Sequence, residues 1–594
     1  MRVSLRTGAL ALAATLAGSQ AVWAASVIRG PYLQTPTNSS IIVRWRTDVA
    51  TTSRVAIGPN PGSLATNFDD ATPVTDHVVP VSGLAAGTYY YSVGSVAGAF
   101  VGDDADHFFQ TAGIGAATPF RIWSIGDAGF PNATLDAVRD SFKTYNGGTS
   151  ATDLFLLLGD NAYGSNLLAN DANYQLSVFG EHAEMLRTTP VYSVFGNHER
   201  FVSQDLTQAG DYFNMFSFPK AAEAGGVASG TEAYYSFDFR NVHFVVLDSE
   251  DYAVSAGALT PMTTWLQSDV AATTQDWVVA LWHRPPYSRG LLHNSDTETN
   301  EINMRQTVLP VLENLGVDLV LCGHSHSYER SFFIDGHYGL GSTFNDSFKK
   351  DLGDGDPTGD GAYRKAASGV SSNAGAVYAV NGSGSEVRIA TLNHPAHIRG
   401  LLEAGSMVID VDQNSLTAKF LSSAGAVDDQ FQIVKGTQCP PAPATGCNTA
   451  VRGKLAMRNG KWGWKWKGGT IDPVDAGDPR AETDFAVCIY PASGPAFLGG
   501  ELLHGASEWK AIKRGYLYRD KTFARYGFEK IKLRTGTPSL STLVQVKGRG
   551  TLPTLPASLP VTAQLVNLDT GKCWSSEFST AELNQSGRFL AVIP

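Results

Sequence analysis

The sequence has 594 residues, more than one hydrophobic core can organise, so we expect three or four domains. Hydrophobic residues make up 43% of the chain and charged residues 17%, which excludes a disordered or fibrous protein. The formal charge is −11, and no cluster of Lys and Arg stands out in the main body of the chain, so we expect no nucleic-acid partner.

Residues 1–24 have the pattern of an export signal. Arg2 and Arg6 precede the apolar stretch Gly8–Gly18, and residues 22–24 (VWA) resemble a cleavage site. About 11 apolar residues cannot cross a bilayer that needs ~20, and no later segment is long enough. We therefore expect a secreted or periplasmic protein without a transmembrane segment.

The first part of the mature chain, residues 25–114, alternates short β-like runs with turn residues. This pattern is typical of a small β-sandwich of immunoglobulin-like size. The predicted strands are Ser40–Thr47, Arg54–Ile57, His77–Val81, Thr88–Val93 and His107–Thr111. None of them carries a cluster of catalytic residue types, so we expect this domain to pack against the next one or to shape its cleft.

From Phe120 onward, apolar strands alternate with amphipathic stretches, which predicts a largely parallel, layered α/β domain over residues 118–432. The predicted strands are Phe120–Gly126, Asp153–Gly159, Val191–Gly196, Asp276–Trp282 and Asp318–Cys322. The predicted helices are Thr134–Tyr145, Asn173–Arg187, Met262–Val270 and Glu301–Leu315.

A side chain that can bind a metal follows each of these five strands. Because the carboxyl ends of strands in an open α/β sheet line one crevice, we expect these side chains to meet at one edge of the sheet. Asp, Asn and His are ligands suited to Fe, Zn or Mn. A single Asp after a strand is usually a turn former, but five in order predict a metal centre. They are Asp127, Asp160, Asn197, His283 and the pair His324 and His326.

The segments around these residues resemble the five sequence blocks of purple acid phosphatases, in the calcineurin-like metallophosphoesterase superfamily. The blocks are GDAG at 126–129, GDNAY at 159–163, GNHE at 196–199, His283 within ALWHRPPY, and GHSH at 323–326. With GPYLQ at 30–34, the resemblance covers roughly residues 27–430 and points to the large, plant-like forms. It implies a multidomain α/β protein: a fibronectin type III-like β-sandwich, a four-layer α/β/β/α metallophosphatase domain, and a further β-rich domain.

The resemblance also implies a set of metal ligands. Two metals ~3.5–4 Å apart can clamp both oxygens of a phosphoryl transfer, and a metal-coordinated hydroxide would attack the phosphate ester. Tyr163 would bind Fe(III), because a phenol becomes a ligand only beside a strong Lewis acid. The second metal would be Zn, Mn or Fe. The first metal would bind Asp127, Tyr163 and His326, the second Asn197, His283 and His324, and Asp160 would bridge them.

Three further residues receive catalytic roles from the same resemblance. His198 would contact the phosphate or protonate the leaving group, as a side chain that titrates near neutrality can do. Glu199 would orient this region. His293 resembles an outer phosphate-binding histidine, although the plant-like forms often have two adjacent histidines where this chain has Leu292 and His293.

The last part of the chain changes composition again. Residues 433–449 contain a Pro-rich linker, and 450–594 predict a β-rich domain of unknown role. Four cysteines lie in the last third of the chain, Cys439, Cys447, Cys488 and Cys573, and predict two disulfides with three possible connectivities, whereas Cys322 is expected to be buried and free. The alternating tryptophans of 461–467 (KWGWKWK) lie on one face of a predicted strand. They either face outward, where they could contact envelope glycans, or form a buried core. We favour the buried core, because a half-buried strand shows the same alternation.

Two alternatives to a secreted monoester phosphatase remain at this stage. The same metals could serve a phosphodiesterase or nucleotidase, because Tyr163 reports the metal and not the leaving group. A non-catalytic secreted binding protein would be expected to have lost ligands, and none is missing from the sequence.

Overall fold

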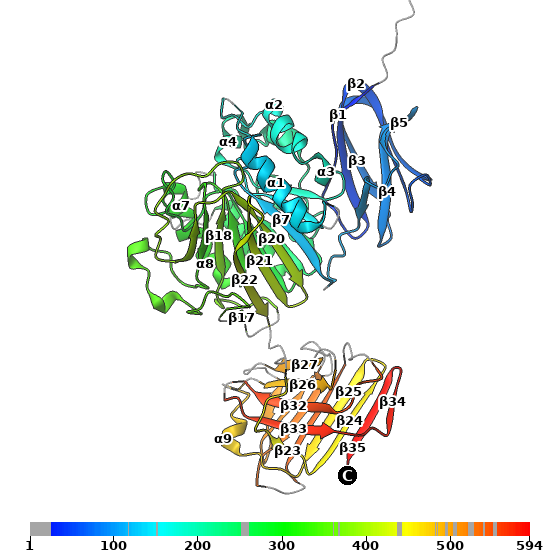
Figure 1. The fold of residues 1–594 in the computed structure, drawn as a ribbon, viewed down its shortest axis with the longest axis vertical. Coiled ribbons are helices and arrows are strands. Elements are labelled where there is room, and N and C mark those ends of the chain that lie inside the picture. The colour runs from blue at the N-terminus through cyan, green and yellow to red at the C-terminus, as the bar shows by residue number, and fades with distance from the viewer. Residues whose placement is uncertain are drawn as a thin grey trace, which may run out of the picture.

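The computed structural model describes residues 25–594 except 117, 150–151, 165, 251–259, 360–361, 366–368, 436–441, 482, 484, 494–496, 503–507, 521–527, 538–540, 550–554 and 569. The expected export signal at 1–24 lies outside the described residues. An N-terminal β domain, a layered central domain and a C-terminal β domain follow one another along the chain (Figure 1). In the described part of the chain, no helix is both long and apolar enough to cross a membrane.

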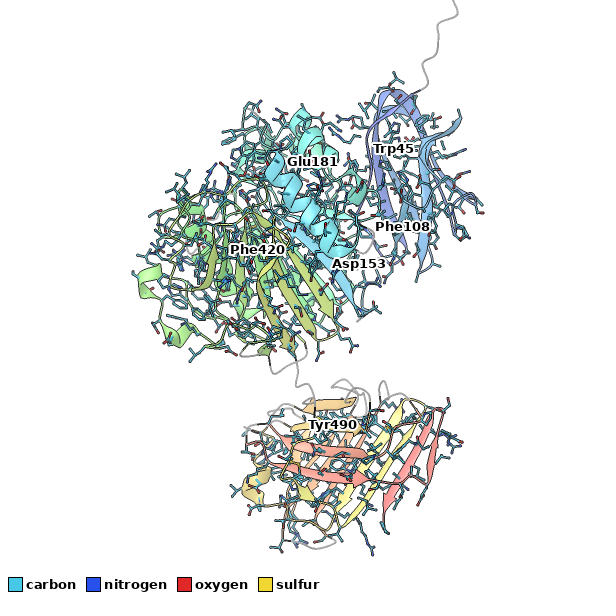
Figure 2. The ribbon with its side chains drawn as sticks, in the orientation of Figure 1. Trp45, Phe108, Asp153, Glu181, Phe420 and Tyr490 are labelled. Carbon is cyan, nitrogen blue, oxygen red and sulfur yellow. A yellow bond between two sulfur atoms is a disulfide. The ribbon has the colours of Figure 1, made fainter. Side chains whose placement is uncertain are left out.

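The N-terminal domain is built from two long strands, β2 and β3, and four shorter ones. Trp45, labelled in Figure 2, is buried in its core. Polar contacts join this domain to the central domain: Tyr32 Oη donates to the Met215 carbonyl in a buried hydrogen bond of 2.7 Å, and Arg29 binds the partly exposed Asp171 at 2.8 Å. The strands are β1 (Val27–Gln34), β2 (Ser40–Gly58), β3 (Thr66–Ser82), β4 (Thr88–Ser95), β5 (Gly98–Gly102) and β6 (Phe108–Gln110).

Two seven-stranded sheets form the middle of the central domain. In order across the sheet, the first consists of β17 (Tyr363–Lys365), β22 (Val427–Lys435), β21 (Ser415–Ser422), β20 (Gly405–Asp412), β7 (Phe120–Ile125), β8 (Leu154–Leu157) and β9 (Val191–Ser193). The second consists of β12 (Tyr235–Phe239), β13 (Val242–Val246), β14 (Trp277–Leu281), β15 (Leu319–Cys322), β18 (Val377–Asn381), β16 (Tyr328–Ser331) and β19 (His397–Leu401).

Helix α1 packs against β20 and β21 of the first sheet, and helices α6 and α8 share a buried cluster with β13, β14 and β15 of the second sheet. Helix α1 begins at the cap Asn132, whose side chain accepts from two backbone N–H groups, and ends at Gly147, whose φ is 70°. Trp123 of β7 stacks on Phe142 of α1. The helices and turns are α1 (Ala133–Asn146), α2 (Asp171–Tyr174), η1 (Gln175–Gly180), α3 (Ala183–Leu186), α4 (Asn197–Arg200), α5 (Asp211–Met215), α6 (Pro261–Ala272), α7 (Thr299–Asn303), η2 (Met304–Val308), α8 (Leu309–Asn314), η3 (Gly341–Thr343) and η4 (Asp346–Phe348); β10 (Ser203–Gln204) and β11 (Ala209–Gly210) form a small hairpin.

The expectation of a largely parallel domain is wrong in part. β7, β8 and β9 are parallel, but β20, β21 and β22 pair antiparallel beside them. The predicted linker at 433–449 also begins inside β22. Lys435, the last residue of that strand, is fully buried and lies 2.6 Å from Asp318, so it belongs to the central domain.

The C-terminal domain has two sheets around one core. The first is β23 (Asn448–Thr449), β33 (Cys573–Phe578), β32 (Val561–Asn567), β26 (Phe485–Pro491) and β27 (Phe497–Leu502). The second is β28 (Trp509–Ala511), β29 (Tyr516–Arg519), β30 (Phe528–Arg534), β31 (Leu543–Arg549), β25 (Lys461–Lys467), β24 (Arg452–Arg458), β35 (Arg588–Ile593) and β34 (Leu583–Gln585); α9 is Pro473–Ala476.

The tryptophans of β25 form part of this core. Trp462, Trp464 and Trp466 are 4%, 1% and 0% exposed. The idea that they form a glycan-binding face is therefore wrong, because burying three indoles stabilises the domain more than exposing them would. Cys447 and Cys573 form one of the expected disulfides. Cys322 is buried and free, as predicted, whereas Cys439 lies outside the described residues.

Candidate metal centre

The candidate ligands lie where strands of both central sheets end. Asp127, Asp160 and Asn197 follow β7, β8 and β9 of the first sheet. His283 and His324 follow β14 and β15 of the second. The expectation of one sheet edge is therefore corrected: two facing sheets each present a row of strand ends, and the residues meet between them.

Three of these residues have an unusual backbone conformation. Asp127, Asp160 and His324 have φ angles of 54°, 51° and 69°, in the left-handed region that side chains other than Gly rarely adopt. Such strain persists where the surrounding structure enforces it, and it concentrates at functional sites. The neighbouring Gly323 is required by space, because a Cβ there would lie 2.5 Å from Asp127 Oδ2.

One group of side chains surrounds the phenol of Tyr163. Its Oη lies 3.0 Å from Asp127 Oδ1, 3.4 Å from Asp160 Oδ2 and 3.3 Å from His326 Nε2. Burial, Asp127 and Asp160 raise the pKa of Tyr163 well above its ordinary value. Only a strongly charged cation would therefore hold this oxygen as a phenolate.

A second group lies on the other side of Asp160. Asp160 Oδ2 is 3.3 Å from His283 Nε2, which is 3.2 Å from Asn197 Oδ1. Ligand atoms of Asp160, His283 and His324 lie within 4.8 Å of one another. Asp160 thus stands between the two groups, in the position that a bridging carboxylate needs.

Hydrogen bonds fix which ring nitrogens are free. His283 Nδ1 donates to the Leu158 carbonyl at 2.9 Å, so Nε2 is the nitrogen that faces Asp160 and could bind a metal. Burial lowers the pKa of His283, but Asp160 outweighs burial and raises it to about 10, so a metal would displace a proton from Nε2. Burial lowers the pKa of His324 well below its ordinary value, and burial together with Arg388 lowers that of His326 to about 4. Both rings are therefore neutral near pH 7 and can act as ligands.

The donor set fits a pair of cations. Asp127 is fully buried beside Asp160, and burial and this neighbour raise its pKa well above the ordinary value. Two buried carboxylates close together are costly unless positive charge compensates them. The seven side chains that converge on this point offer only oxygen and nitrogen donors, which suit iron, zinc or manganese.

Glu199 is placed to hold Asp160 rather than to touch a substrate. It is fully buried and accepts from the backbone N–H groups of Asp160, Asn161 and Gly196 at 3.0, 2.9 and 3.1 Å. Tyr174 Oη donates to it at 2.8 Å. We therefore describe Glu199 as a positioning residue.

His198 and His293 lie at the margin of the cluster. His198 Nδ1 donates to the Leu167 carbonyl at 2.7 Å, and its Nε2 lies 3.7 Å from Asp160 Oδ2. The rings of His293 and His324 are 3.7 Å apart between centroids. Both histidines are partly exposed, so a ligand can reach them from solvent.

The structure adds residues that the sequence motifs did not indicate. Glu298 lies 2.9 Å from His293 Nδ1, 3.1 Å from His324 Nε2 and 2.8 Å from Arg284 Nη1. Arg284 also pairs with Glu250 at 2.6 Å and is largely buried. No spacing rule connects Glu298 to the motif histidines, because the contact depends on how the 284–298 loop folds back.

Comparisons with known proteins found similar sequences. Residues 120–328 match the family described as calcineurin-like phosphoesterase. Purple acid phosphatase 15 of Arabidopsis thaliana is 29% identical over 280 residues, covering 43% of this chain and 49% of that protein. Purple acid phosphatase 22 of the same plant is 31% identical over 266 residues, covering 43% and 53%. The chain thus spans about half the length of these relatives.

A solved structure shares the fold. A purple acid phosphatase from yellow lupin (Lupinus luteus) seeds superimposes with a TM-score of 0.51 at 17% identity, covering 70% of this chain and 78% of that chain. This protein carries a calcineurin-like metallophosphoesterase domain and is a homologue of proteins named purple acid phosphatases.

Proposed function

We propose that this protein is a secreted, metal-dependent acid phosphatase that hydrolyses phosphate monoesters at a dinuclear centre. The observation that carries the proposal is the convergence of Asp127, Tyr163 and His326 on one side of Asp160, with Asn197, His283 and His324 on the other. Fe(III) suits the first group because it contains a phenol, and Zn, Mn or Fe suits the second.

Each side chain has a task in this proposal. When bound, the metal pair supplies Lewis acidity toward the phosphoryl oxygens and lowers the pKa of water. Asp160 holds the two ligand groups together, and Glu199 holds the Asp160 loop in its strained conformation. The carbonyl of Leu158 keeps His283 in the tautomer that presents Nε2.

His198 is the residue best placed to give a proton to the leaving oxygen. Its Nδ1 proton is held by the Leu167 carbonyl, so Nε2 can carry a second proton toward the cluster. His293 would bind a phosphoryl oxygen beside His324, with Glu298 holding its other nitrogen.

Secretion rests on the export pattern of residues 1–24 and on the Cys447–Cys573 disulfide, since disulfides persist in oxidising compartments. The monoester substrate class is supported by a relative named phosphoenolpyruvate phosphatase from Allium cepa. It is 27% identical over 315 residues, covering 50% of this chain and 60% of that protein.

The test combines metal analysis with paired substrates. Purified protein should contain iron and a second metal and absorb visible light through the Tyr163 phenolate, and it should hydrolyse 4-nitrophenyl phosphate faster than bis(4-nitrophenyl) phosphate. A faster diester reaction would replace the monoester proposal with a phosphodiesterase. Protein that binds no metal and hydrolyses neither ester would leave the non-catalytic binding protein.

A further inference from the structure

The charge of this protein is unevenly distributed. Residues 448–594 contain 20 Lys and Arg against 12 Asp and Glu, a formal charge of +8. Residues 1–447 contain 25 against 44, a formal charge of −19. The net charge of −11 therefore conceals a basic C-terminal domain, whose excess charge needs an explanation of its own.

The positive charge is concentrated on one sheet face. In β25 the tryptophans point into the core, so Lys461, Lys465 and Lys467, which lie on the opposite face of the strand, point outward. The neighbouring β24 also has outward basic residues. In the strand register, Arg452 lies opposite Lys467, Lys454 opposite Lys465, and Arg458 opposite Lys461. Six basic residues thus lie side by side on two strands.

The pattern continues across β30 and β31, on the other side of β25. Their outward residues include Lys530, Lys532, Arg534, Lys547 and Arg549. In register, Lys461 is opposite Arg549 and Lys530 is opposite Lys547. We call these eleven residues of β24, β25, β30 and β31 the basic face. The remaining positions on this side of the four strands hold Ala456, Gly463, Gln545 and Leu543, of which Leu543 is buried.

The basic face is unfavourable for the isolated domain. Like charges directly opposite each other on paired strands destabilise a sheet, and Lys454–Lys465 and Lys530–Lys547 are such pairs. Partial burial and the adjacent Lys532 lower the pKa of Lys530. In these four strands the one acidic residue is Glu529, in the bulge before Lys530. Because this arrangement costs stability, we infer that the basic face binds a partner.

The shape of the face selects among anionic partners. The strands are ~4.8 Å apart and alternate residues ~6.8 Å apart, so the charges form a lattice in two dimensions. A linear polyanion would meet only one line of this lattice, whereas the surface of a lipid bilayer presents anionic headgroups in both directions. The indoles that could stack on bases are buried in the core, which disfavours single-stranded nucleic acid.

We propose that the basic face binds the surface of an anionic phospholipid bilayer. The attachment is peripheral and electrostatic, because the small residues Ala456 and Gly463 between the cations offer nothing to insert into the acyl chains. The inference is independent of the metal centre and of the ester that is hydrolysed.

The test is sedimentation of the full chain with phosphatidylcholine vesicles that do or do not contain phosphatidylglycerol. We expect binding only to the anionic vesicles, and release in about 1 M salt, where the screening length is about 3 Å. Each basic residue near the surface contributes about fivefold to partitioning, so Lys465→Glu with Lys547→Glu should weaken it about 25-fold or more.

The matched control carries the same charge change away from the face: Lys220→Glu with Lys572→Glu, both at exposed positions. It should bind vesicles within about twofold of the parent. Both variants should keep the parent's circular dichroism and hydrolysis of a soluble ester. Equal binding of the parent and the face variant would overturn the proposal. So would binding to duplex DNA or to a sulfated polysaccharide without binding to vesicles.

Discussion

The candidate metal centre and the basic face use charge in opposite ways. At the candidate metal centre, Asp127, Asp160 and His324 are at most 3% exposed, and all three have a strained, left-handed backbone. On the basic face, most cations are exposed and stand on ordinary strands. The first site depends on the distance between a few atoms, whereas the second depends on the number of like charges on one surface. Single substitutions should therefore damage the first severely and the second slightly.

The largest effect should come from Asp160→Asn. An amide offers one oxygen, whereas the carboxylate stands between the groups of Tyr163 and His283. We expect the loss of at least one metal and of ester hydrolysis, a larger effect than the 10–100-fold typical of an outer partner. Elemental analysis checks this, with the exposed Asp140→Asn as control. A variant that keeps two metals would contradict the expectation that a single substitution severely damages this site.

Two adjacent residues of β25 face opposite sides of the strand, Trp464 toward the core and Lys465 toward solvent. Trp464→Ala removes a buried indole that also donates to Ser576 Oγ at 3.1 Å, and should lower the free energy of unfolding by about 3–5 kcal/mol. Lys465→Ala, on the basic face, should change it by less than about 0.5 kcal/mol. Denaturant unfolding of the C-terminal domain measures both. Similar losses would show that the lysines also stabilise the fold.

A second buried group of charged side chains in the central domain, outside the candidate metal centre, is centred on His243. His243 lies 2.7 Å from Asp238 and 2.9 Å from Asp269; burial lowers its pKa, but these carboxylates outweigh burial and raise it to about 9. Because the folded pKa is raised, the stabilisation is complete below the unfolded value of about 6.5 and is lost as pH rises through about 9.

The expected loss is about 3 kcal/mol in the free energy of unfolding between about pH 6 and pH 9.5. His243→Gln should lack this pH dependence while remaining folded. Unfolding curves of both proteins at the two pH values make the measurement, and parallel pH profiles for the two would contradict it.

The smallest effect at the metal cluster should come from Glu199→Gln. The amide nitrogen of Gln cannot accept from the backbone N–H groups of Asp160 and Gly196, so the Asp160 loop should relax. We expect metal affinity to fall about 10–100-fold without unfolding. Competition with a chelator measures it, and Glu184→Gln, at an exposed pair with Lys143, is the control. Unchanged metal affinity would mean that the strained backbone at Asp160 does not depend on the hydrogen bonds to Glu199.

Much of the architecture could be predicted from the sequence. The apolar runs ending before Asp127, Asp160 and His283 predicted β7, β8 and β14 to within a few residues, because these strands are buried on both faces and read as continuous apolar segments. The antiparallel β20–β22 meander went unrecognised. Its strands alternate in polarity, and nothing local to them specifies which sheet they complete.

The basic face went unrecognised for a similar reason. Its cations alternate with apolar residues on four strands that are separated by up to about a hundred positions, so no local cluster appears in the chain. The strands bring them together through pairing, which a search for runs of Lys and Arg does not detect.

The sequence by itself determined which residues stand at the strand ends and that they suit metals, because each ligand lies in a short motif with its own turn. It also determined that β25 has two unlike faces, because alternation is a local property of a strand. Only the tertiary structure decided that two sheets meet at the ligands, that Glu298 reaches His293 and His324, and that the tryptophans face inward. These facts depend on contacts between segments far apart in the chain, whose energies are set by packing rather than by local spacing.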